Sequence, residues 1–267
     1  MIVDCHTHAF PDFLAPKAIP ALAANSGLTP FHDGTANGLL ALMDRCGIDR
    51  AVVLSIATKP TQEHSVNAFA VSLLEQPRLI PFGSVFPSSD TWREQLEALK
   101  TAGIRGIKLH PEYQQFDLDT EAALAVYRRC GELGLLVQFH AGMDAAFEPP
   151  VHTGAARINR VCELCPETTF IAAHFGGYDM WEDAAANLNP HANLYLDTSM
   201  TRTAAKIQAE TARRIVTIHG ADHILLGSDS PWELPGDSVA GVRALNLSPE
   251  DTAAILGGNA ERLLALR

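Results

Sequence analysis

Two histidines separated by one residue are the first chemically capable group of this sequence, in the run Asp4-Cys5-His6-Thr7-His8. Side chains alternate across a strand, so this run predicts Asp4, His6 and His8 on one face and Cys5 and Thr7 on the other. Neutral imidazole is a good ligand for zinc and other first-row metals. Asp4 fits better as an acceptor that orients a histidine N–H. The alternative is a pair of core or exposed histidines that precede a loop.

Further polar residues stand where apolar runs end. His140 follows Leu135–Phe139, His174 follows Phe170–Ala173, and Asp229 follows the run that begins at Leu225. His110 closes another such run, after Lys108. A carboxylate at the end of an apolar strand is costly unless it meets a metal or a hydrogen-bonding partner. These residues therefore form the candidate site, provided that the fold gathers the strand ends.

The periodicity predicts a fold that does gather them. Short apolar runs recur every 25–35 residues and alternate with amphipathic stretches, which is typical of βα units and a parallel sheet. Strands are predicted at 2–5, 51–56, 79–85, 106–110, 135–140, 169–174, 194–197 and 223–228. Helices are predicted at 38–46, 62–75, 91–100, 120–132, 155–164, 181–187, 203–219 and 249–266.

Eight such units in one chain of 267 residues predict an α/β fold, a single-domain (β/α)₈ TIM barrel over residues 1–267. An open doubly wound sheet is the competing architecture, but no GxGxxG follows the first strand. The Pro-containing segment 10–31 is interpreted as an inserted loop, either a lid or an interface.

Composition limits the partners. The net charge of −11 argues against nucleic acid and anionic membranes, which need clustered Lys and Arg, and leaves a small molecule as the expected partner. No signal peptide is visible and no apolar stretch approaches the roughly 20 residues of a membrane span, so a cytoplasmic location is expected. Cys162 and Cys165 have CxxC spacing, but no second pair exists to complete a structural zinc site.

Taken together, these motifs resemble the amidohydrolase superfamily, specifically its amidohydrolase-related branch of hydrolases and non-oxidative decarboxylases. The resemblance spans nearly the whole chain in the expected order. It is carried by five further features besides the opening motif: Gly106-Ile107-Lys108-Leu109-His110-Pro111, His140, His174, Gly227-Ser228-Asp229-Ser230-Pro231-Trp232, and Gly258-Asn259-Ala260.

The resemblance implies roles for individual residues. His6, His8, His140 and Asp229 correspond to the ligands of one divalent metal, with Zn²⁺ expected and Mn²⁺ or Fe²⁺ as alternatives. His174 corresponds to the catalytic histidine that binds or polarises the substrate. Asp229 also corresponds to the base that takes a proton from metal-bound water, whose pKa a metal lowers toward about 7. A homodimer is a reasonable assembly on the same grounds.

The bridging carboxylated lysine of the binuclear members has a counterpart only near Lys108, so a single metal is expected. His110 is assigned to substrate binding or to a spare ligand, and Trp232 to a wall of the pocket. Arg157, which opens a helix, is either an anion-binding residue or part of a solvated helix face.

Three functions remain open at this stage. The first is hydrolysis of an amide, ester or lactone-type bond by metal-activated water. The second is non-oxidative decarboxylation of an aromatic or unsaturated carboxylic acid, for which Arg157 and Lys108 are the candidate carboxylate clamps. The third is a metal-binding barrel without activity, which the complete set of site residues disfavours.

Overall fold

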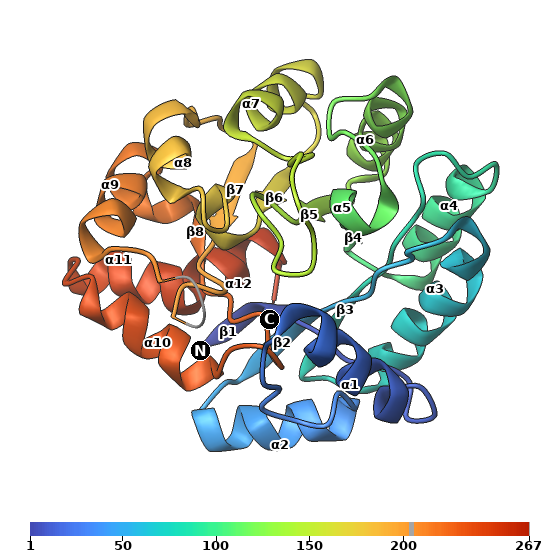
Figure 1. Ribbon diagram of the computed structural model, residues 1–267, viewed down its shortest axis with the longest axis horizontal. Helices are drawn as coiled ribbons and strands as arrows, with labels where there is room; N and C mark the ends of the chain where they lie inside the picture. Colours follow the sequence, from blue (N-terminus) through green and yellow to red (C-terminus); the bar gives the residue numbers. More distant parts are fainter. Residues whose placement is uncertain (203–205, 267) are drawn as a thin grey trace.

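The computed structural model describes residues 1–202 and 206–266 and shows strands enclosed by a ring of helices (Figure 1). All eight predicted strands are present, and each starts within one residue of its predicted start. Their bounds are β1 Val3–Thr7, β2 Arg50–Leu54, β3 Leu79–Phe82, β4 Gly106–Leu109, β5 Leu136–Phe139, β6 Phe170–Ala172, β7 Leu194–Asp197 and β8 Ile224–Leu225.

Every strand pairing is parallel, in the ladders β1-β2-β3 and β4-β5-β6-β7-β8. Backbone hydrogen bonds join the two ladders at both edges. The Gly83 N–H donates to the Gly106 carbonyl at 3.0 Å, and the Cys5 N–H donates to the Leu226 carbonyl at 2.7 Å. The ring of strands is therefore closed as in a (β/α)₈ barrel, which confirms the predicted fold class.

The helices confirm most of the predicted ones. Their bounds are α1 Ala15–Ser26, α2 Ala36–Cys46, α3 Glu63–Ser72, α4 Trp92–Ala102, α5 Pro111–Gln114, α6 Glu121–Leu133, α7 Ala155–Leu164, α8 Trp181–Asn187, α9 Ala209–His219, α10 Pro235–Ala244, α11 Pro249–Ala253 and α12 Asn259–Leu263. The predicted helix 203–219 begins at Ala209 in the described part, and residues 203–205 lie outside the described residues. The predicted helix 249–266 is divided, because the π turn Ala254–Gly258 separates α11 from α12.

Three helices were not predicted, and two have a common physical reason. α1 has Pro16 in its first turn and Pro20 in its interior. α10 begins at Pro235 and contains Gly236 and Gly241. Proline and glycine weaken an amphipathic pattern that tertiary packing can still stabilise. α5 is only four residues long. The prediction that segment 10–31 is a loop was therefore wrong for its central part.

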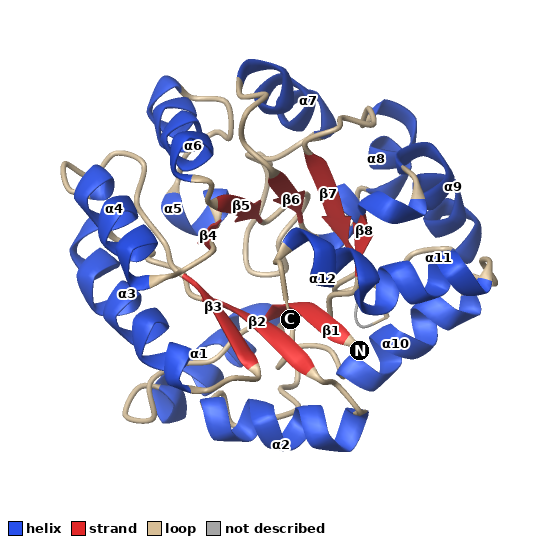
Figure 2. Ribbon diagram, turned by 180° about the vertical axis from the view of Figure 1, so that it is seen from behind, coloured by secondary structure: helices blue, strands red, loops and turns tan. Residues whose placement is uncertain are grey.

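Apolar packing closes the end of the barrel away from the strand C-termini. Val3, Val52, Phe82 and Leu225 form one buried cluster with Leu264, which follows α12. Figure 2 shows α12 in front of the strands when the molecule is seen from behind. The opposite end, where the strands terminate, is thus the end that remains for a site. None of the described helices is long and apolar enough to cross a membrane.

Candidate metal centre and active site

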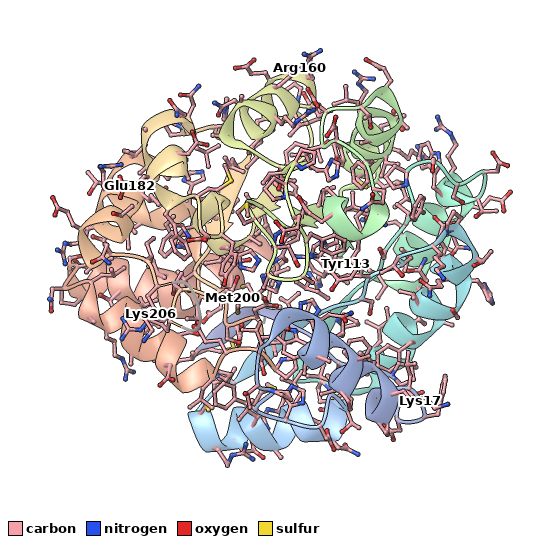
Figure 3. The ribbon with its side chains drawn as sticks, in the orientation of Figure 1. Lys17, Tyr113, Arg160, Glu182, Met200 and Lys206 are labelled. Atoms are coloured by element: carbon pink, nitrogen blue, oxygen red, sulfur yellow. The ribbon has the colours of Figure 1, made fainter. Side chains whose placement is uncertain are left out.

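A cavity of about 120 Å³ lies at the C-terminal ends of the strands. Its lining comes from the segments after seven of the strands and from α1. The lining residues are His8, Phe10, Leu22, Ser26, Leu28, Ile56, Tyr113, His140, Asp144, Ala145, His174, Tyr178, Met200, Asp229 and Trp232. Figure 3 shows Tyr113 and Met200 near the centre of the ring and Arg160 and Glu182 at its edge. Segment 10–31 is thus a wall of the cavity.

His6, His8 and Asp229 converge at this end of the barrel. Asp229 Oδ1 lies 2.8 Å from His8 Nε2 and 3.3 Å from His6 Nε2. The two imidazole rings are inclined by 67°, so their ring nitrogens can face a common point. Each of the three residues offers one ligand atom within 4.8 Å of the other two.

The hydrogen bonds of the His6 and His8 rings leave the nitrogens that face Asp229 available to a cation. His6 Nδ1–H donates to Asp197 Oδ2 at 2.8 Å, and His8 Nδ1–H donates to the Leu54 carbonyl at 2.9 Å. In neutral rings, the Nε2 atoms that face Asp229 then carry lone pairs. Two lone pairs and a carboxylate oxygen then lie close together, where a cation would relieve their repulsion; Lys108 Nζ reaches His6 Nε2 at 3.3 Å from below. Two imidazole nitrogens and one carboxylate oxygen are ligands typical of a divalent metal site, and three protein ligands leave further coordination positions for water or substrate.

Electrostatics at Asp229 act in opposite directions. Burial raises the pKa of this carboxyl, but His6, His8 and Lys108 outweigh burial, so its pKa lies below the ordinary value. Burial also lowers the pKa of His6 well below its ordinary value, and Lys108 adds to that effect. An ionised carboxylate beside a neutral imidazole is a pair that can bind a cation. Asp229 and His174 both have left-handed φ angles, 68° and 59°, and such backbone strain clusters at functional sites.

The predicted alternation along β1 was wrong. The strand register shifts between Asp4 and Thr7, and Cys5 joins the apolar cluster inside the barrel. Because of this bulge, His6 turns inward although Cys5 does so as well. Asp4 does not orient a histidine ring: it accepts from the His6 backbone N–H at 3.1 Å and from the Ser228 hydroxyl at 2.5 Å. It ties β1 to the segment after β8, and burial raises its pKa to about 7.

His140 is placed with a different group. Its Nε2 donates to the Met143 carbonyl at 2.7 Å, and it lies with His110 and Asp144 in a second set of candidate ligands. The rings of His110 and His140 are stacked, 4.4 Å apart and 11° from parallel. The lone pairs of two stacked rings lie in parallel planes, so they cannot both point directly at one ion. This second set is therefore less suited to a cation than the set of His6, His8 and Asp229, and His140 as a ligand stays a prediction.

His174 lies against both groups. Its ring is 5.1 Å from that of His6, and its Nε2 is 3.1 Å from His140 Nδ1. Burial lowers the pKa of His174 well below its ordinary value, and the neighbouring His140 and His6 lower it further. The residue is therefore a neutral imidazole at the cavity wall, able to accept or donate a hydrogen bond.

Lys108 is fully buried beneath these residues. Its Nζ donates to His6 Nε2 at 3.3 Å, and burial lowers its pKa to about 8 against the pull of Asp197 and Asp229. Lys108 does not line the cavity, and neither does His110, which is buried next to Glu112 and Asp144. Two of the proposed substrate-binding residues thus lie below the cavity surface.

Of the two remaining predicted residues, Trp232 lies at the cavity and Arg157 does not. Trp232 lines the cavity, and its backbone N–H donates to the Asp229 carbonyl at 2.9 Å. Arg157 instead pairs with Asp117 at 3.0 Å and with Asp119, outside the cavity lining. Among the described residues that line the cavity there is no Lys or Arg.

Sequence reasoning missed Asp197, Ser199 and Asp144. Asp197 ends the predicted strand 194–197, so the argument that drew attention to Asp229 applied to it equally. Asp144 carries no such signal, because it lies in an irregular loop. Its pKa is below the ordinary value: burial raises it, but the hydrogen bond with His110 and the nearby His140 outweigh burial.

A closed barrel with side chains suited to a metal at the carboxyl ends of its strands is the architecture of TIM-barrel enzymes. The chain belongs to the amidohydrolase family, because the family model described as Amidohydrolase matches residues 3–266. This match confirms the resemblance seen in the sequence. No curated protein matched the chain.

Solved structures share the fold. An uncharacterised TIM-barrel protein of Bordetella bronchiseptica is 23% identical, with a TM-score of 0.79 and coverage of 99% of this chain and 98% of that one. A dihydroxybenzoic acid decarboxylase of a Polaromonas species, with bound manganese, is 17% identical, with a TM-score of 0.71 and coverage of 99% and 97%. A probable 2-pyrone-4,6-dicarboxylic acid hydrolase of Acinetobacter baumannii is 16% identical, with a TM-score of 0.69 and coverage of 99% of both chains. At these identities the likeness establishes the fold alone.

Proposed function

We propose that this protein is a metal-dependent hydrolase that cleaves an amide, ester or lactone-type bond of a small molecule. The observation that carries the proposal is the convergence of His6 Nε2, His8 Nε2 and Asp229 Oδ1 beside a cavity without a cationic lining residue among the described ones. We further propose Zn²⁺ as the cation, since two imidazoles and a carboxylate suit it, with manganese as the alternative that the Polaromonas relative suggests.

His6, His8 and Asp229 would hold a divalent cation, which when bound would supply a water of lowered pKa as a nucleophile at neutral pH. The chain's own residues then have separate tasks. Asp229, whose pKa lies below its ordinary value, is ionised at neutral pH and would accept a proton from such a water. His174, a neutral imidazole that lines the cavity, would contact the substrate. Phe10, Trp232 and the apolar side chains of segment 10–31 exclude bulk water and hold an apolar substrate.

Non-oxidative decarboxylation is the second candidate. The decarboxylase from the Polaromonas species has the same fold, and Lys108 places a buried amine near the same histidines. Besides the proposed metal, however, no cationic side chain of the described lining residues would hold a substrate carboxylate, because Lys108 lies below the cavity surface and Arg157 is paired elsewhere. This difference favours a neutral ester, lactone or amide.

The metal content of the purified protein tests the proposal first. We expect about one zinc or manganese per chain by mass spectrometry, and we expect chelation to abolish turnover in a panel of small esters, lactones and amides. Asp229→Asn should remove most of the turnover while the circular dichroism spectrum stays unchanged. Arg157→Ala is the matched control, because it removes a charge outside the cavity.

A parallel panel of hydroxybenzoates, assayed for carbon dioxide release, separates the two reactions. Hydrolysis without carbon dioxide release supports the hydrolase, and the reverse supports the decarboxylase. Less than about 0.2 metal per chain together with turnover that survives chelation would overturn both, since a catalytic metal must be near stoichiometric.

A further inference from the structure

We propose that Asp197 and Ser199, at the end of β7, form one positioning unit for His6 and His174. In this unit Asp197 sets the affinity of the cation site through His6, and Ser199 fixes the orientation of the His174 ring. The inference rests on the proposed function, because it concerns the same cation site. Neither residue lines the cavity, so each acts through a histidine.

Asp197 accepts hydrogen bonds from three other segments of the chain and from its own segment. Its Oδ2 accepts from His6 Nδ1 at 2.8 Å and from Gln138 Nε2 at 2.9 Å. Its Oδ1 accepts from the backbone N–H groups of His174 at 3.1 Å and Ser199 at 3.0 Å, and also from the Ser199 hydroxyl. The carboxylate is completely buried. It therefore has no freedom to move, and the His6 ring that it holds is fixed as well.

This contact decides which nitrogen of His6 is available. Since Nδ1–H is donated to the carboxylate, Nε2 keeps its lone pair and faces Asp229. A carboxylate behind a ligand histidine fixes the tautomer and makes the ligand more basic, and its loss typically reduces metal affinity 10–100-fold. Asp197 is the acceptor that His6 requires for this purpose, a task that the sequence had suggested for Asp4.

Ser199 extends the unit to His174. The Ser199 hydroxyl has one proton, which goes to Asp197, so its oxygen remains an acceptor for ring N–H groups. It lies 2.8 Å from His174 Nδ1 and 3.0 Å from His6 Nδ1. Donation of His174 Nδ1–H to this oxygen leaves His174 Nε2 with a lone pair, which accepts from His140 Nδ1 at 3.1 Å, so both ring nitrogens of His140 carry a proton in this arrangement. One buried hydroxyl thus fixes the relative position of a candidate ligand and a candidate catalytic histidine.

The test measures zinc affinity by chelator competition and the visible spectrum of the Co²⁺-loaded protein. Asp197→Asn should weaken Zn²⁺ binding 10–100-fold and change the Co²⁺ absorption bands. Ser199→Ala should leave the affinity within about threefold, because the bond between His6 and Asp197 remains. Ser89→Ala is the matched control: its buried hydroxyl donates to Glu63 at 2.6 Å, away from the cavity, and it should change neither readout.

The Ser199 part has its own readout. In the long-range ¹H–¹⁵N spectrum of the zinc-loaded protein, His174 should show a protonated Nδ1 in the wild type. The Ser199→Ala variant should lose this pattern while the His6 signals stay in place. A protonated Nε2 in the wild type, or an unchanged His174 in the variant, overturns the assignment of Ser199.

The outcomes also separate this inference from the proposed function. If the wild type binds Zn²⁺ tightly and Asp197→Asn binds it equally well, the inference about Asp197 fails and the metal-dependent hydrolase stands. If the wild type binds neither Zn²⁺ nor Co²⁺, the proposed function itself fails. Should Asp197→Asn not fold, Gln138→Met removes one donor to the same carboxylate and should weaken Zn²⁺ binding severalfold. No loss in that variant would likewise refute the role of Asp197.

Discussion

Gly142 allows the segment after β5 to pack directly on the segment after β6, and its replacement tests how the cavity wall is built. Its φ angle is +87°, and a Cβ added there would lie 2.3 Å from the Tyr178 nitrogen and 2.5 Å from the Gly177 carbonyl carbon. Both atoms belong to the backbone and cannot swing aside. The adjoining Tyr178 N–H and carbonyl bind Ala141 and Met143 at 2.8 and 2.9 Å. Gly142→Ala must therefore separate two hydrogen-bonded segments.

The magnitude follows from three contributions. A left-handed alanine costs about 1 kcal/mol. Forcing a methyl group into an occupied space costs roughly 1–3 kcal/mol. Loss of the two backbone hydrogen bonds adds about 1 kcal/mol each if the segments part. We expect Gly142→Ala to lower the free energy of unfolding by about 4–6 kcal/mol, which for a chain of this size corresponds to a fall in Tm of roughly 10–20 °C.

Urea and thermal unfolding of the metal-free protein, followed by circular dichroism, measure the effect against two control glycines. Gly47 has a φ of +68° but no atom within 4 Å of an added Cβ, so Gly47→Ala should cost only the backbone share of about 1 kcal/mol. Gly154 has neither a positive φ nor a neighbour within 4 Å, and Gly154→Ala should stay within about 0.5 kcal/mol. If Gly142→Ala costs no more than Gly47→Ala, the close packing of the two segments is refuted.

Replacing His8 by Ala should reduce zinc affinity more than replacing His140, because His8 Nε2 faces Asp229 at 2.8 Å whereas His140 Nε2 is bonded to the Met143 carbonyl. Equilibrium dialysis gives the order, and equal losses would restore His140 as a ligand of the same rank. Burial lowers the pKa of Lys108 from its ordinary value of 10.5 to about 8, so the unfolded chain binds more protons between these pH values. Wild-type stability relative to Lys108→Met should then rise by up to about 3 kcal/mol from pH 8 to pH 10.5 in urea unfolding, and a constant difference would contradict the burial of a neutral amine. Arg157→Ala should leave KM and kcat within about twofold, since the side chain pairs with Asp117 and Asp119 outside the cavity, and a tenfold rise in KM would place it in substrate binding.

The barrel could be predicted because its signal is local. Each strand is a short apolar run, and each following helix shows apolar residues with the 3.6-residue period of an amphipathic helix. The two patterns can therefore be told apart in the sequence. The strand ends also carried the candidate site, since parallel strands of a barrel end at one mouth. The same reasoning failed for α1 and α10, where proline and glycine reduce the local pattern and packing against the barrel stabilises the helix instead.

What the sequence alone determined is thus the fold class and the residues at the mouth of the barrel: His6, His8, His174 and Asp229. Only the tertiary structure decided how they combine. A register shift in β1 turned His6 inward, and the carboxylate behind it came from Asp197, 191 residues away. His140 was placed against His110 and the Met143 carbonyl. Such pairings depend on strand register and loop course, which bring together residues that no local pattern relates.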